Sequence, residues 1–176
     1  MKKSIENPVH KEGIKELSKQ LDQNFRKFFG QPADNNNYQV QEEVLTYSDL
    51  YSDRMLIVNA IKSGIPYHLF SLIQQISPFS DNEWSGILDL SVRTLQRYQQ
   101  SNKPFKPIHA EKIIELAEVT KLGLEVFEYN SENFKLWLET PSFALGKRKP
   151  IDLLTDSYGK DLVINELVRI EEGIFV

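Results

Sequence analysis

The chain has 176 residues, and its 21 Lys and Arg against 25 Asp and Glu give a formal net charge of −4. At roughly 150 residues per domain, this length predicts one domain or two small domains packed together. The absence of cysteine excludes disulfide frameworks, Cys-ligated zinc, iron–sulfur clusters and a cysteine nucleophile, and it fits a reducing cytosol. As an average, the negative charge argues against a nucleic-acid-binding protein.

The sequence shows no targeting signal and no membrane span. Four polar residues occupy the place where a signal peptide needs its apolar core: Glu6, His10, Lys11 and Glu12. Purely apolar runs, such as Met55–Val58, are far shorter than the ~20 residues that cross a bilayer. We therefore expect a cytoplasmic protein with no membrane partner.

Residues 1–50 are predicted to form an N-terminal extension with one amphipathic helix near residues 14–29. Its apolar residues recur at spacings of three and four, which gives a helix one buried face: Ile14, Leu17, Leu21, Phe25 and Phe28. Gly30 and Pro32 end the helix. Residues 38–47 alternate weakly and predict a short strand or an extended linker. An isolated helix of this length is marginal, so we expect it to pack on the fold, on a second copy or on a partner.

From residue 48 onward the hydrophobic pattern is helical almost without a break, divided by prolines and glycines. The predicted helices lie near residues 50–62 and 67–76, after a cap at Ser80 or Asp81, after a cap at Ser91, from Pro107 to about Leu122, near residues 131–139, after Pro150, and over residues 160–172. Thr155 is the expected cap before the last helix, and Gly173 the expected left-handed residue after it. The sequence therefore predicts an all-α fold.

The segment Phe79–Tyr98 has the pattern of a helix-turn-helix. Ser85 is small where the first helix touches the second, and Leu88 to Ser91 have the length of the turn. Four apolar residues are placed to lock the crossing of the two helices: Trp84, Leu88, Leu90 and Leu95. Many such turns carry glycine, whereas this one carries Asp89, which tolerates left-handed dihedral angles better than most residues do.

The second helix of this motif carries side chains suited to DNA. Arginine binds guanine or phosphate, while hydroxyl groups and helix N-terminal amides suit phosphate oxygens. Residues 91–106 hold four cations and no acid, whereas residues 122–176 hold six cations and ten acids, so the average charge describes neither region. The candidate DNA-binding residues are Ser91, Arg93, Thr94, Gln96, Arg97 and Lys103. The alternative is an ordinary solvated helix with two arginines.

From Gly64 onward the chain carries a distinctive set of residues in a fixed order and spacing. In the first part they are Gly64-Ile65-Pro66, Ser91–Arg97, Ala110-Glu111, Ile114–Ala117 and Val126-Phe127. In the C-terminal part they are Trp137-Leu138, Thr140-Pro141, Leu145-Gly146, Pro150–Thr155, Gly159, Val163, Leu167, Arg169–Glu171 and Gly173. In this set the chain resembles the Xre/MbcA/ParS class of type II antitoxins. The resemblance covers about two thirds of the chain and leaves the first 50 residues unmatched.

The resemblance implies a bacterial antitoxin that binds a RES-domain toxin, an NAD-consuming enzyme, and blocks its active site. It also implies that the helix-turn-helix binds operator DNA and autoregulates the operon, usually more strongly in the toxin complex. The expected organisation is an extension over residues 1–50, an Xre-like helix-turn-helix domain over residues 51–122 and a toxin-binding domain over residues 123–176. A homodimer is expected, because paired modules bind a palindrome.

Most apolar residues of the C-terminal part are expected to be core, including Phe134, Trp137 and Leu138. In the last helix, four residues are expected to pack inward: Leu162, Val163, Leu167 and Ile170. We hypothesise that its outer face and the apolar end of the chain plug the toxin's cleft. The candidate toxin-binding residues are Arg148, Arg169, Glu172, Ile174, Phe175 and Val176. Arg148 belongs to the basic run 147–149, for which a solvated loop is the alternative.

An enzyme is the weakest class of function. The histidines at positions 10, 68 and 109 have no metal-binding spacing, and the chain lacks a phosphate loop, a dinucleotide fingerprint and a nucleophile elbow. We therefore expect no catalytic residue, no metal site and no cofactor. Two alternatives to the antitoxin remain open: a stand-alone helix-turn-helix transcriptional regulator without a toxin partner, and an interaction module whose helix-turn-helix is vestigial.

Overall fold

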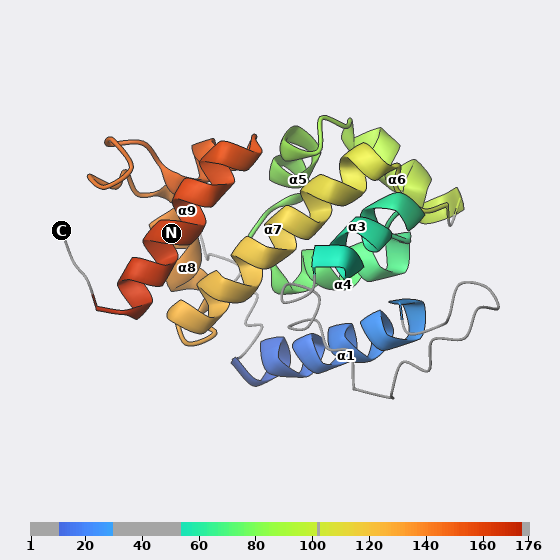
Figure 1. Cartoon of the computed structure of the whole chain (residues 1–176), viewed down its shortest axis with the longest axis horizontal. Helices are drawn as coiled ribbons and strands as arrows, with labels where there is room; N and C mark the ends of the chain where they lie inside the picture. Colours follow the sequence, from blue (N-terminus) through green and yellow to red (C-terminus); the bar gives the residue numbers. More distant parts are fainter. Residues whose placement is uncertain (1–10, 30–53, 102, 174–176) are drawn as a thin grey trace, which may run out of the picture.

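A computed structural model describes residues 11–29, 54–101 and 103–173 of the chain, and within these ranges the fold is all-helical (Figure 1). Its elements are α1 (Lys11–Phe29), α3 (Arg54–Ser63), α4 (Tyr67–Ile76), α5 (Asp81–Ile87), α6 (Val92–Ser101), α7 (Pro107–Val126), α8 (Ser131–Glu139), the 3₁₀ turn η1 (Pro150–Leu153) and α9 (Ser157–Glu171). The predicted fold class is therefore confirmed. The segment at 38–47, expected as a strand or linker, lies outside the described residues.

Helix α7 is the central element on which both halves of the fold pack. Pro107 occupies its first turn, where the missing N–H costs nothing, and the helix continues for 20 residues, or about 30 Å. It packs against α3 in one half and against α9 in the other (Figure 1). Its buried residues face more than one side: Ala110, Ile113, Ile114, Leu116, Ala117, Val119, Thr120, Gly123 and Leu124.

An aromatic cluster holds the helices that precede α7. The Phe70 ring meets the Trp84 ring edge-on at a centroid distance of 5.1 Å and lies 4.9 Å from the Phe105 ring. The Tyr98 ring stacks on Phe105 at 4.2 Å. Because these four residues come from α4, α5, α6 and the segment before α7, their contacts fix the first half of the fold around one core.

Helix α1 packs on α4 along the lower side of the molecule in Figure 1. Ile14 and Leu21, two residues of the predicted apolar face, are buried there. The Lys15 ammonium lies 5.3 Å from the centre of the Tyr129 ring, which belongs to the turn after α7. The expectation that this helix packs is confirmed, and its place is on the fold itself.

The C-terminal half depends on two close approaches that only glycine permits. A Cβ at Gly123 of α7 would lie 2.1 Å from the Phe134 ring of α8. A Cβ at Gly159 of α9 would lie 2.0 Å from the carbonyl oxygen of Leu153. These contacts bring α8 and η1 tightly against the longer helices.

Three sequence-based expectations about this half need correction. Helix α7 extends to Val126, past the expected end near Leu122, and it passes through Gly123, whose missing side chain leaves room for the Phe134 ring. The cap of α9 is Asp156 rather than Thr155: the Asp156 carboxylate accepts the Gly159 N–H at 2.9 Å, which places Gly159 in the first turn, against Leu153.

The third correction concerns Leu162, which is 53% exposed instead of packed inward. The buried face of α9 runs through Gly159, Val163 and Leu167, which are spaced four residues apart. Leu162 lies about 100° around the helix from Val163 and therefore faces outward. Ile170 is half-buried, and Gly173 has the expected positive φ, +72°.

None of the helices in the described ranges has the length and apolar composition that crossing a bilayer requires.

We predict that Gly123→Ala lowers the free energy of unfolding by about 2 kcal/mol, because the added methyl group overpacks the contact with Phe134. Gly86→Ala is the matched control, since a Cβ at Gly86 of α5 meets no atom within 4 Å and alanine favours the helix by about 0.5–1 kcal/mol. Urea unfolding measures both variants. Equal stability of the two variants would contradict the proposed packing.

Candidate nucleic-acid interface and partner-binding surface

The helix-turn-helix is formed by α5, the turn Leu88–Ser91 and α6. In the turn, Asp89 adopts a left-handed φ of +53°, and the Leu90 N–H donates to the Ser85 carbonyl at 2.9 Å. From α7, the Lys112 ammonium donates to the Ile87 carbonyl at 2.9 Å, which satisfies an orphan carbonyl at the end of α5. The predicted position of the turn and the left-handed Asp89 are confirmed.

The start of α6 is held by its own hydroxyl groups. The Ser91 hydroxyl accepts the Thr94 N–H at 3.1 Å and lies 2.8 Å from the Thr94 hydroxyl, so Ser91 caps the helix as predicted. Leu95 is buried and anchors the inner side of α6. The opposite side of the helix therefore points to solvent in a fixed orientation.

The outer side of α6 lines an open hollow, formed by five predicted DNA-binding residues and one that was not predicted: Ser91, Arg93, Thr94, Gln96, Arg97 and Gln100. Gln100 completes the stripe at helical spacing from Arg93 and Arg97, a periodicity that the sequence already contained. Lys103 is exposed beyond the end of α6 and does not line the hollow.

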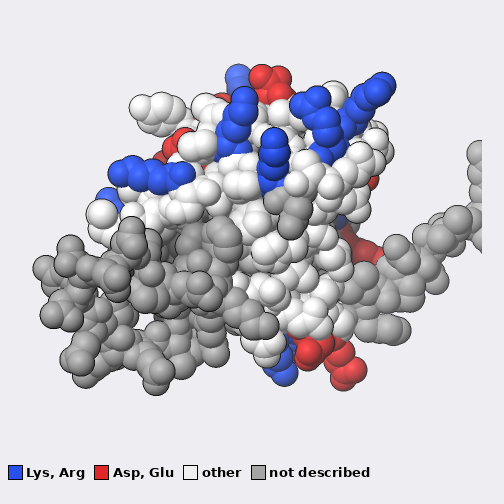
Figure 2. Space-filling model, turned by 90° about the vertical axis from the view of Figure 1, so that its right-hand side faces the viewer, with Lys and Arg blue, Asp and Glu red and all other residues white. Residues whose placement is uncertain are grey.

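The face around α6 is cationic. Figure 2 shows Lys and Arg side chains gathered over the upper part of this end of the molecule. Among the described residues, neither Arg93 nor Arg97 forms an ion pair with a carboxylate. Burial lowers the pKa of His109 and outweighs its hydrogen bond with the Leu88 backbone, so His109 is neutral at pH 7. The charge of this face therefore comes from arginine and lysine.

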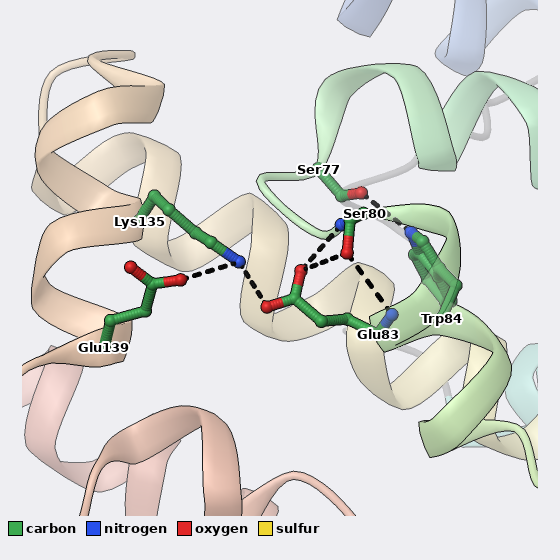
Figure 3. Close-up of polar contacts among 6 residues, drawn as sticks. All are labelled: Ser77, Ser80, Glu83, Trp84, Lys135 and Glu139. Atoms are coloured by element: carbon green, nitrogen blue, oxygen red, sulfur yellow. Dashed lines mark hydrogen bonds and ion pairs between the residues drawn. The ribbon is translucent and has the colours of Figure 1, made fainter.

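A polar cluster joins α5 to α8 (Figure 3). One oxygen of the Glu83 carboxylate accepts the Ser80 N–H at 2.7 Å and completes a capping box with the Ser80 hydroxyl. Its other oxygen lies 2.5 Å from the Lys135 ammonium, which also contacts Glu139 at 3.4 Å. Partial burial raises the pKa of Glu83, but the hydrogen bonds from Lys135 and Ser80 lower it overall.

The outer face of α9 is the candidate partner-binding surface. Arg169 and Glu172 are exposed on it, as predicted, with Arg169 3.9 Å from Glu166. Sequence reasoning missed Tyr158 and Leu162, which lie four residues apart on this face and are 87% and 53% exposed. Their outward position depends on which face of α9 packs through Gly159 and Val163, so the sequence pattern alone did not indicate it.

Of the remaining predicted partner-binding residues, only Arg148 belongs to the described part of the chain. Arg148 is exposed in the loop between α8 and η1. Ile174, Phe175 and Val176 lie outside the described residues. Phe134 and Leu138 are buried core, as expected, and Trp137 is half-buried against the Phe127 and Phe134 rings. Within the described ranges, no cluster of His, Cys, Asp and Glu is arranged to hold a metal ion.

Two family models match consecutive parts of the chain. Residues 57–118 match the antitoxin Xre-like helix-turn-helix domain, and residues 123–173 match the antitoxin Xre/MbcA/ParS C-terminal toxin-binding domain. The mycobacterial cidal antitoxin MbcA of Mycobacterium tuberculosis is 30% identical over 95 residues, which are 53% of this chain and 80% of MbcA. The chain belongs to the Xre/MbcA/ParS family of antitoxins.

One further relative and one solved structure are also similar to the chain. The antitoxin Xre of Yersinia enterocolitica is 25% identical over 120 residues, which cover 68% of this chain and 81% of that antitoxin. Among solved structures, the MbcT–MbcA toxin–antitoxin complex of M. tuberculosis contains a chain that is 26% identical, with a TM-score of 0.46, over 68% of this chain and 94% of that chain. These relatives are named antitoxins, not enzymes, and the matched family ranges begin at residue 57, so α1 lies outside them.

We predict that Lys135→Met lowers the stability of this antitoxin by about 1 kcal/mol at pH 7, because it leaves the half-buried Glu83 carboxylate without its ammonium partner. The folded pKa of Glu83 lies below its ordinary value of 4.5, so the stabilisation is present above that pH and is lost as pH falls through the folded pKa. Urea unfolding over a series of pH values from 7 downward should show the deficit shrink as the Glu83 carboxylate becomes protonated.

The control for this prediction is Lys121→Met, which removes a more exposed pair with Glu125, worth about 0.5 kcal/mol or less. A Lys135→Met deficit that persists unchanged at low pH would mean that lost packing, not the charge, causes the effect.

Proposed function

We propose that this antitoxin neutralises a cognate RES-domain toxin that consumes NAD, by binding it through residues 123–176 and blocking its active site. We propose further that the helix-turn-helix domain, residues 51–122, binds operator DNA and autoregulates the operon in the cytoplasm. One observation carries the proposal: the chain combines a cationic α6 face, whose arginines form no ion pair with described residues, with a match to the toxin-binding domain, whose last helix exposes apolar side chains.

The DNA-binding part is supported by the geometry of α6. Arg93 and Arg97 lie one turn apart on its solvent side and are not engaged by described carboxylates. The Ser91 and Thr94 hydroxyls stand at the N-terminus of the helix, where the macrodipole also favours phosphate. We propose that Ser91, Thr94 and Lys103 bind phosphates while Arg93, Gln96 and Arg97 contact base edges.

A homodimer fits this DNA-binding role. One recognition helix covers a short half-site, and two helices related by a two-fold axis bind a palindrome with much greater specificity. The proposal therefore places the α6 helices of the two protomers in two successive major grooves on one side of the duplex.

The toxin-binding part is supported by the outer face of α9. Tyr158 and Leu162 offer an apolar contact at the start of the helix, and Arg169 and Glu172 offer polar contacts toward its end. An aromatic side chain that buries its ring on binding is a frequent anchor of protein interfaces. We propose that this face covers the toxin's cleft and keeps NAD out of it.

We predict that the double variant Arg93→Ala, Arg97→Ala binds DNA from the antitoxin's own promoter about 100-fold or more weakly than wild type, with a smaller salt dependence, because each arginine contact contributes ~1–3 kcal/mol. Gel-shift titrations at two salt concentrations measure both effects. Arg169→Ala is the matched control, since it removes an arginine from α9 and should leave DNA affinity unchanged. Wild-type affinity in the double variant would contradict the assignment of α6.

We predict that co-expression of the antitoxin with a RES-domain gene from its own operon restores growth, and that the two proteins co-purify. The double variant Tyr158→Asp, Leu162→Asp should abolish the rescue, because two desolvated carboxylates oppose burial of this face. Ile108→Asp is the control, since Ile108 is also an exposed apolar residue, at 62%, but lies on the helix-turn-helix half. Specific promoter binding without any co-purifying toxin would favour the stand-alone regulator instead.

A further inference from the structure

The loop between α8 and η1 is held in one conformation by its own backbone. The Ser142 N–H donates to the Arg148 carbonyl at 3.0 Å, and the Lys147 N–H donates to the Ser142 carbonyl at 2.8 Å. The Gly146 N–H donates to the Phe143 carbonyl at 3.0 Å. Together with the buried side chain of Leu145, these bonds make residues 142–148 a closed, preformed loop.

This loop exposes an aromatic ring, and one of its residues, Lys147, adopts an unfavourable backbone conformation. Phe143 is 76% exposed, although a phenylalanine ring gains free energy when it leaves water. Gly146 and Lys147 have φ values of +67° and +63°, a conformation that lysine rarely adopts. Backbone strain combined with an exposed anchor is typical of a binding loop that is organised before its partner arrives.

The loop also concentrates positive charge in an acidic part of the chain. Lys147, Arg148 and Lys149 are three of the six cations in residues 122–176, where ten acids lie. All three are exposed, and none of them forms an ion pair with another described residue. Their charges are therefore available to complement a partner surface that carries carboxylates.

DNA is an unsuitable partner for this loop in the arrangement proposed above. Figure 1 shows the loop, in orange, at the end of the molecule opposite α6. A duplex held by α6 lies against the other end. The loop belongs instead to residues 123–173, which match the toxin-binding domain.

Resting on the proposed function, we propose that residues 142–148 are a second anchor for the toxin: Phe143 enters an apolar pocket whose rim is acidic and which lies outside the NAD site. A site that holds a dinucleotide diphosphate is lined by cations and N–H donors, so it repels this loop. The carboxylate of Glu172, exposed on the outer face of α9, suits that site instead. The two surfaces thus contact differently charged parts of one toxin.

The test is a calorimetric titration of the purified RES-domain toxin with the full-length antitoxin and its variants. Phe143→Ala should weaken toxin binding at least about tenfold, as loss of an aromatic anchor does, with an unchanged melting temperature. Phe143→Tyr should bind like wild type, because it keeps the ring. Ile108→Ala, which removes another exposed apolar side chain, from the other half, should also bind like wild type.

A second set of variants tests the charge and the preformed backbone. Replacement of all three cations of 147–149 by glutamine should weaken binding about threefold to tenfold at low salt and flatten its salt dependence. Gly146→Ala should weaken binding about threefold through its backbone alone, since a Cβ there meets no atom within 4 Å.

Three results would overturn the proposal, and they differ in meaning. Wild-type toxin affinity in Phe143→Ala excludes the loop as an anchor and leaves the proposed function intact. A loss of promoter affinity in Phe143→Ala with unchanged toxin affinity makes the loop a DNA contact. Failure of the wild-type antitoxin to bind the toxin rejects both the loop anchor and the proposed function.

Discussion

The structure depends on one shared helix. Helix α7 buries residues on one side against the helix-turn-helix half and on another against α9, so neither half completes its core without it. A continuous helix of 20 residues is stiff over its length, which sets α6 and α9 at fixed positions in one body. The two proposed binding surfaces, on α6 and on α9, then lie toward opposite ends of the protein (Figure 1).

Charged contacts reinforce this arrangement where the two halves meet. Lys135 of α8 binds the carboxylate that also caps α5, so a change in α8 bears directly on the first helix of the helix-turn-helix. On the other side of α7, Lys160 contacts Glu118 at 3.3 Å and Asp161 at 2.9 Å; burial lowers its pKa, but these carboxylates raise it overall. Half-buried pairs with several hydrogen bonds hold geometry better than exposed pairs, because fewer side-chain rotamers compete.

Much of the fold could be predicted from the sequence because proline, glycine and capping residues mark the helix ends. Pro66 and Pro107 fix the starts of α4 and α7, and Ser80 and Ser91 cap α5 and α6. The predictions were wrong where two neighbouring residues had similar local propensities and tertiary contacts determined the outcome. Thr155 and Asp156 can both cap a helix, and the approach of Gly159 to Leu153 decided between them.

The candidate sites were predictable to different degrees. The arginines of α6 follow from helical spacing and local charge, so sequence alone placed them on the outer side. Leu162 could not be assigned correctly, because its exposure depends on which face of α9 carries Gly159. Phe143 had no sequence signal either: its exposure results from hydrogen bonds that close the loop and turn Leu145 inward.

The central claim is that DNA and toxin bind separate surfaces of one rigid antitoxin. Its most direct measurement is sedimentation of the labelled promoter fragment with the antitoxin, before and after addition of the purified RES-domain toxin. Separate surfaces predict a heavier species that contains DNA, antitoxin and toxin, with promoter affinity retained or increased. Release of the promoter fragment as toxin is added would contradict the claim, because it would mean that the two partners compete for the same surface.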